Sequence, residues 1–228
     1  MNKLLFSPIN IGTLTIPNRI IMPAITTNYS IESDERQANF YAEIARGGAG
    51  LIIMGAIQAI YPGRREDGKM TANKDEDIPH LQKLAKAVHD NGGKVAAMLA
   101  VWNLWAKGGV GTPAEDISPS GVVTLRQLPA TWAQTQFVPT SRPLALEEIH
   151  MIQEQVAAAA SRVVEAGFDA LELQATAGTL IHRFINPHTN QRTDEYGGSV
   201  ENRLRMLLET IALIRKKTSR RWLKAWPG

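Results

Sequence analysis

The sequence predicts an α/β fold built on parallel strands, because short apolar runs alternate with longer segments of helical periodicity. Four strand–helix units follow one another along the chain. Each crossover helix returns the chain to the same end of the sheet, so strands joined in this way run parallel. Units of this kind fit either half of a closed (β/α)8 barrel or a doubly wound sheet.

The first two units are read from apolar runs of strand length. The first combines a strand at 19–22 with a helix around 40–46, which a Gly-Gly pair ends. The second combines a strand at 50–54 with a helix at 78–91. Pro79 suits the first turn of that helix, and a second Gly-Gly pair suits its end.

The last two units give the clearest helices. The third combines a strand at 94–99 with a helix at 146–166, which has two glutamates near its start and a glycine after its end. The fourth combines a strand at 170–173 with a helix at 200–217, where leucine and isoleucine recur at helical spacing.

A long segment at 101–144, rich in proline and glycine, separates the third strand from its helix. A connection of this length inside a domain is typical of a functional loop or lid. A (β/α)8 barrel needs about 250 residues, whereas four units occupy most of this chain of 228 residues. We therefore expect a single domain over 1–228 that is C-terminally incomplete, with an irregular tail at about 218–228.

Composition restricts the possible functions. The chain is 44% hydrophobic and 21% charged, with a net charge of +3 and no cysteine. These values are ordinary for a soluble globular domain, and the lack of cysteine excludes disulfides, thiolate zinc sites and cysteine-bound clusters within the chain. Basic residues gather only near the end, as on a solvated helix, so no nucleic-acid partner is expected. No apolar run is long enough for a signal-peptide core or a membrane span, which favours a cytoplasmic protein.

Ligands of parallel α/β folds bind at the carboxyl ends of the strands. Here these ends are poor in ionisable groups, with neither paired carboxylates nor a histidine cluster, so no metal site is predicted. The lone Glu172 in the fourth strand is equally compatible with a structural role. The glycines at 47–50 precede a strand instead of opening a helix after one, so they are not a dinucleotide fingerprint.

A polar loop follows the fourth strand and leads into the last helix. Ser199 is placed to cap that helix. The side chains of Arg192, Asp194, Glu195 and Arg203 are close enough in sequence to form an ion-pair network. We therefore predict that this loop is structural and not catalytic.

The same loop closely resembles a signature of the Old Yellow Enzyme family of NADH:flavin oxidoreductases. The matching residues are Asn190, Arg192, Asp194, Glu195, Tyr196, Gly197, Gly198, Ser199, Glu201, Asn202 and Arg203. Further matches lie in family order at 5–8, 11–12, 17–20, 47–53 and 166–169. The chain is thus similar to the N-terminal half of that family, and in particular to its 2,4-dienoyl-CoA reductase-like members.

The resemblance implies a (β/α)8 TIM barrel, of which about the first four units are present, with FMN at its mouth. The flavin takes a hydride from NADH or NADPH and passes it to an activated alkene or a similar small-molecule acceptor. Two family side chains, His with His or Asn, polarise the substrate carbonyl, and a Tyr supplies the proton.

The flavin contacts implied by the resemblance are partly retained. Pro23, Ala24 and Ile25 fall on backbone that lines the ring, and Thr26 falls beside it. Ala56 is a small residue at the flavin-facing end of the second strand.

The polar contacts are mostly replaced. Met98 stands where the family has a Gln that bonds the flavin pyrimidine, and a thioether is only a weak acceptor. Gln174 replaces the first carbonyl donor, Ala177 the second, and Thr179 the proton-donating Tyr. No confident catalytic residue is therefore predicted.

Three functions stay open. The chain is the N-terminal half of an FMN-dependent oxidoreductase, or an inactive remnant that binds a partner through its open strand edges. The third alternative is an intact barrel-like enzyme of other chemistry, which two copies of the chain assemble. Flavin binding and oligomeric state distinguish them.

Overall fold

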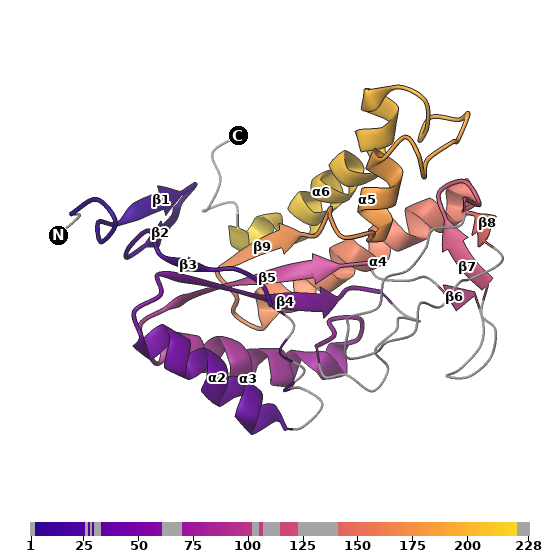
Figure 1. Ribbon diagram of the computed structural model, residues 1–228. Coiled ribbons are helices and arrows are strands. Elements are labelled where there is room, and N and C mark those ends of the chain that lie inside the picture. The colour runs from indigo at the N-terminus through magenta and orange to yellow at the C-terminus, as the bar shows by residue number, and fades with distance from the viewer. Residues whose placement is uncertain are drawn as a thin grey trace.

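The computed structural model describes residues 3–25, 27, 29, 33–60, 70–101, 105–106, 115–122 and 141–222. Its central sheet has the strand order β3 (Ile21–Met22), β4 (Leu51–Gln58), β5 (Lys94–Ala100), β9 (Ala170–Leu173). All three pairings are parallel, with Ile21 opposite Leu51, Ile52 opposite Val95 and Leu99 opposite Leu173. The order of the strands in the sheet is therefore their order in the chain (Figure 1).

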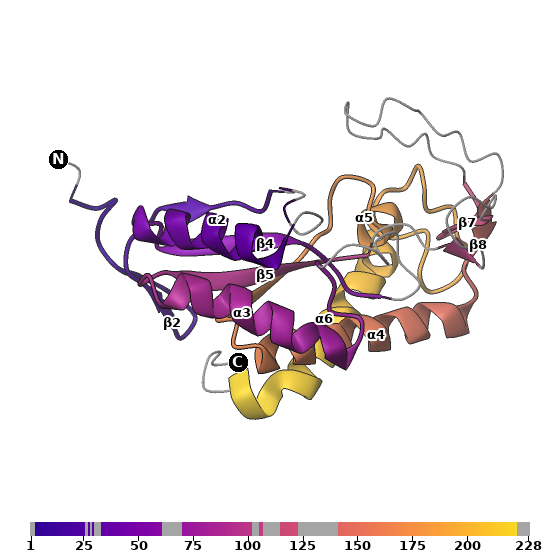
Figure 2. The ribbon, with the colours of Figure 1, turned by 90° about the horizontal axis from the view of Figure 1, so that it is seen from below.

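Four helices connect or follow these strands: α2 (Asp34–Arg46), α3 (Ile78–His89), α4 (Leu146–Glu165) and α6 (Val200–Trp222). Helices α2 and α3 lie side by side, as do α4 and α6 (Figures 1 and 2). A single buried cluster contains residues of all four helices together with alternate residues of the strands, such as Ile52 and Val95. Helices on one face of a sequentially ordered parallel sheet form an incomplete barrel, since a doubly wound sheet has helices on both faces.

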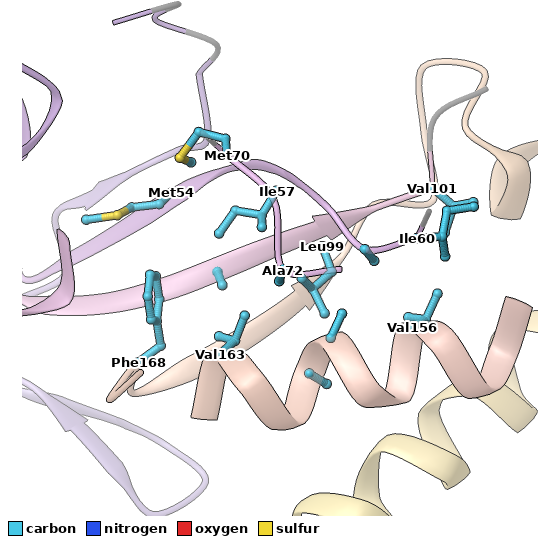
Figure 3. Close-up of a cluster of buried hydrophobic side chains, with 14 of the residues drawn as sticks. Met54, Ile57, Ile60, Met70, Ala72, Leu99, Val101, Val156, Val163 and Phe168 are labelled. Atoms are coloured by element: carbon cyan, nitrogen blue, oxygen red, sulfur yellow. The ribbon is translucent and has the colours of Figure 1, made fainter. Parts of the chain in front are cut away.

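The main core lies between this sheet and the helices. Val156 and Val163 of α4 point toward the sheet, and Leu99 and Ala72 lie across from them (Figure 3). Side chains of a strand alternate between its two faces. The residues between these positions, including Leu51 and Ala96, therefore lie on the inner face, which in a closed barrel would be its interior.

A hairpin of β1 (Ile9–Ile11) and β2 (Leu14–Ile16) precedes the sheet. Its Ile16 is fully buried and packs with Leu51 and Ala96 in a second, smaller cluster on the inner face. The hairpin therefore covers the inner face near the amino ends of the strands. Sequence analysis did not predict it.

The long connection is not irregular throughout. It contributes β6 (Trp105–Ala106), β7 (Glu115–Ser118) and β8 (Ser141–Pro143), which form a small separate sheet. The rest of the connection, at 102–104, 107–114 and 123–140, lies outside the described residues. Two short elements were also not predicted: the 3-10 turn η1 (Asp75–Asp77) and helix α5 (Leu180–Ile185).

The expected irregular tail is wrong in part, because α6 continues to Trp222. The hydroxyl of Thr218 donates to the carbonyl of Ile214 one turn earlier, at 2.8 Å. No proline or glycine follows until Pro227, so nothing in the sequence ends the helix at Lys217. Residues 223–228 lie outside the described part of the chain.

Among the described residues, no helix combines the length and the apolar character that a membrane crossing requires. Within the same residues, no group of three or more histidine, aspartate or glutamate side chains is placed to hold a metal ion.

Candidate functional site at the carboxyl ends of the strands

The carboxyl ends of β3, β4, β5 and β9 point to the same edge of the sheet (Figure 1). Pro23 and Ala24 follow β3 directly and are exposed and half-buried, respectively. Ile25 beside them is 45% exposed. Thr26, the fourth predicted contact of this segment, lies outside the described residues. This edge therefore presents apolar surface with little polar functionality.

Strand β4 is irregular where it reaches this edge. Its pairing with β5 gains one residue between Met54, opposite Ala97, and Ile57, opposite Leu99. The irregularity is a β-bulge that includes the predicted contact Ala56, which is half-buried. Bulges re-aim a strand, and they are frequent beside functional sites.

Met98 of β5 packs tightly against Gly55 of the bulge. A Cβ added at Gly55 would lie 2.8 Å from the Cβ of Met98 and 3.0 Å from its Cε. A side chain at position 55 would therefore collide with Met98. The glycine leaves room for the Met98 side chain to pack against β4. Met98 itself is 9% exposed. The position where the resemblance implies a hydrogen-bonding Gln is thus occupied by a packed thioether.

Gln174 follows β9 directly, and both its backbone N–H and its backbone carbonyl are hydrogen-bonded. Its N–H donates to the carbonyl of Leu99 at 2.9 Å, which continues the ladder with β5. Its carbonyl accepts the Thr179 hydroxyl at 2.9 Å. The side-chain oxygen Oε1 is buried and has no hydrogen-bond partner among the described residues.

Thr179 is fully buried and serves the turn that follows β9. Its hydroxyl lies within hydrogen-bonding distance of two carbonyls, those of Gln174 and Thr176 at 2.9 and 3.0 Å. The proton of this hydroxyl is thus used inside the turn. Ala177 in the same turn is exposed and has φ +54°, a left-handed conformation that is uncommon for residues other than glycine.

Arg183 of α5 is a positioning residue that sequence analysis did not identify. It is 5% exposed, and its Nε donates to the carbonyl of Gly178 at 3.1 Å. Its Nη1 lies 3.4 Å from the carbonyl of Ile117 in β7. The side chain therefore ties the turn after β9 to the small sheet. The sequence signal is a basic residue within the mostly apolar stretch Leu-Ile-His-Arg-Phe-Ile.

The polar loop before α6 has the predicted structural contacts, but of the expected ion-pair network of Arg192, Asp194, Glu195 and Arg203 only the Arg192–Asp194 pair forms among the described residues. Arg192 donates to the carboxylate of Asp194, with Nε 2.9 Å from Oδ1, and to the carbonyl of Leu144 at 2.6 Å. Its hydrogen bond is the main reason why the pKa of Asp194 is lowered, and the backbone N–H of Tyr196 adds to this. Arg203 donates to the carbonyl of Ile185 at 2.9 Å.

The loop is anchored further by buried groups. The amide of Asn190 donates to the carbonyls of Phe184 and Tyr196 at 2.6 and 2.7 Å. The hydroxyl of Tyr196 donates to Glu209 of α6 at 2.6 Å. The pKa of Tyr196 is raised, mainly because the hydroxyl is buried and secondly because of its hydrogen bond to Glu209. Ser199 caps α6, since its Oγ accepts the N–H of Asn202 at 3.2 Å.

The sequence matches the model of a family described as the NADH:flavin oxidoreductase / NADH oxidase family over residues 4–223. It is 36% identical over 216 residues to the NADH oxidase of Thermoanaerobacter brockii, covering 93% of this chain and 32% of that protein. It is 35% identical over 218 residues to the NADPH dehydrogenase of Bacillus subtilis strain 168, covering 92% of this chain and 60% of that protein.

Solved structures agree with these matches. Morphinone reductase in complex with tetrahydroNAD superimposes with a TM-score of 0.77 at 31% identity, covering 93% of this chain and 60% of that one. The Old Yellow Enzyme of Pichia sp. AKU4542 gives a TM-score of 0.77 at 26% identity, covering 94% and 56%. The chain thus spans between about a third and three fifths of the length of these relatives.

Proposed function

Because the chain belongs to the NADH:flavin oxidoreductase / NADH oxidase family, we propose that it forms the N-terminal half-barrel of an FMN-dependent NAD(P)H oxidoreductase of the ene-reductase type. The observation that carries the proposal is the family match over 4–223, combined with an apolar ligand edge at the carboxyl ends of its four parallel strands. In this proposal the protein is cytoplasmic and acts on a small molecule.

The residues at this edge fit the flat, largely apolar ring of a flavin. Pro23 and Ile25 are exposed, Ala56 is small, and the Met98 side chain packs against Gly55. The predicted ring contacts are Pro23, Ala24, Ile25, Thr26, Ala56 and Met98. When bound, FMN would supply hydride transfer between NADH or NADPH and an acceptor.

The chain's own side chains offer little help to ene-reduction. Hydride addition to an activated alkene places negative charge on a carbonyl oxygen, which preorganised donors must stabilise. Gln174 offers one neutral amide, Ala177 offers no side-chain donor, and the Thr179 hydroxyl is used in its turn. We propose that substrate binds beside Gln174 and Ala177 and that its reduction as an alkene is slow.

An FMN titration of the full chain, followed by flavin fluorescence, tests the proposal. We expect saturable binding that is weaker than micromolar, since only part of a family barrel is present. Ala56→Leu places bulk at the ligand edge and should weaken binding further. Ala212→Leu is the matched control, because Ala212 is exposed on α6. Absence of saturable binding, or equal effects of the two variants, would contradict the proposal.

Exposed apolar side chains favour a second candidate function, partner binding. Ile20 and Ile21, at the edge strand β3, are 38% and 43% exposed. A second copy, or another polypeptide that completes the barrel, would cover them and pair the edges of β3 and β9. Light scattering on the purified chain tests pairing with a second copy: a dimer or larger assembly supports such pairing, and a monomer at all concentrations contradicts it.

A further inference from the structure

The side-chain oxygen of Gln174 is a buried hydrogen-bond acceptor without a donor. Atom Oε1 has no partner among the described residues, although the great majority of buried polar side-chain atoms have one. Leaving a buried acceptor unpaired destabilises a fold. An exception of this kind at a ligand edge calls for a functional explanation.

Gln174 projects from the inner face of the sheet. Leu171 and Leu173 pack into the core on the helix side, while Ala170 packs into the inner-face cluster with Leu51 and Ala96. The alternation of side chains along an extended strand places Gln174 on the same face as Ala170. Its amide is therefore directed toward the side of the sheet where the ligand is proposed to bind.

The described side chains of the turn after β9 and the methionine of the neighbouring β5 do not supply the missing donor. The Thr179 hydroxyl bonds two backbone carbonyls, Ala177 has no polar side-chain atom, and a methionine such as Met98 has no donor. The backbone of Gln174 is held by Leu99 on one side and Thr179 on the other. No described side chain supplies a donor to Oε1, and a molecule bound at this edge can supply one.

We propose that Gln174 Oε1 accepts a hydrogen bond from an N–H or O–H group of the bound molecule. The site then selects ligands that donate at this position, in contrast to the carbonyl-polarising donors that the family resemblance implies. The chemical class is a small apolar molecule that carries a neutral hydroxyl or amine. The inference rests on the proposed function only for the location of the ligand.

Cyclohexanol and cyclohexanone are suitable probes, because they have the same ring and only the alcohol can donate. Their affinities for the full chain are measured by ligand-observed NMR without FMN. We expect the alcohol to bind about three- to tenfold more tightly, the range of one net hydrogen bond. Gln174→Met keeps the length of the side chain and should abolish this preference. Glu172→Gln, which changes the exposed carboxylate on the same face, should leave it intact.

Thermal melting of Gln174→Met gives a second readout. Removing an unpaired buried acceptor should raise the Tm by about 2–4 °C. Cyclohexanol should narrow this difference in Tm, because it binds the wild-type chain more tightly than the variant. A lower Tm would show that Oε1 has a partner in the free protein and would overturn the inference. Equal or tighter binding of cyclohexanone, no binding of either probe, or a preference that survives Gln174→Met would also overturn it.

The FMN titration separates this inference from the proposed function. Saturable FMN binding without an alcohol preference refutes only the role of Gln174. An alcohol preference without FMN binding refutes only the flavin proposal.

Discussion

Replacing Asp194 with alanine should destabilise the fold substantially. The Arg192 side chain is 9% exposed, whereas that of Asp194 is 29% exposed. The substitution leaves a nearly buried guanidinium whose remaining described partners are the carbonyls of Leu144 and Pro119. Breaking a fully buried ion pair costs about 3–5 kcal/mol. Partial exposure of Asp194 and the two remaining carbonyls reduce this to roughly 2–3 kcal/mol, or a Tm lower by roughly 4–12 °C.

The assay is thermal unfolding followed by circular dichroism, with Glu43→Ala as the matched control. Glu43 pairs with Arg46 on the surface of α2, where the two side chains are 69% and 58% exposed. Its loss should change stability by no more than about 0.5 kcal/mol. If Asp194→Ala and Glu43→Ala melt at the same temperature, the loop does not stabilise the fold in the way described.

Three further outcomes are expected. Ala177→Gly should raise the free energy of unfolding in urea by about 0.5–1 kcal/mol, because it relieves a left-handed alanine, while Ala212→Gly in α6 should lower it by about 1 kcal/mol. The pKa of Asp194 is lowered in the fold, so its ionised carboxylate stabilises the folded chain at pH values above the ordinary aspartate pKa of about 3.9. The free energy of unfolding in urea should therefore fall as the pH drops through the lowered pKa, and Asp194→Asn should make this acid-side decrease smaller. Reduction of 2-cyclohexenone with NADPH and FMN should be at least about 10²-fold slower than in a family member with both carbonyl donors, and comparable turnover numbers would contradict that account of the site.

Helices and strands were predictable where the hydrophobic pattern repeats over several helical turns or several strand residues. The fourth strand, β9, has the predicted bounds at Ala170–Leu173, since a glycine turn precedes this run of alternating leucines. Helix α4 differs from its prediction by one residue at its end, at Glu165. Strands of three residues, as in the β1–β2 hairpin, and the six-residue α5 are too short to show a period, so they were not found.

The candidate site was predictable by position but not by chemistry. The resemblance located Gln174, Ala177 and Thr179 in the sequence, yet the unpaired Oε1 and the occupied hydroxyl depend on neighbours that only the folded chain brings together. The same holds for Arg183, whose bond to β7 spans 66 residues of sequence. Long-range contacts of this kind leave no local pattern.

The central claim is that FMN binds at the carboxyl ends of the strands, and the methionine methyl groups test it directly. Met98 lies at this edge against Gly55, while Met151 is 53% exposed on α4 and provides an internal control. In a methyl-labelled chain titrated with FMN, we expect the Met98 resonance to shift progressively and the Met151 resonance to stay in place. Shifts at Met151 or elsewhere, with the Met98 resonance unchanged, would contradict the claim.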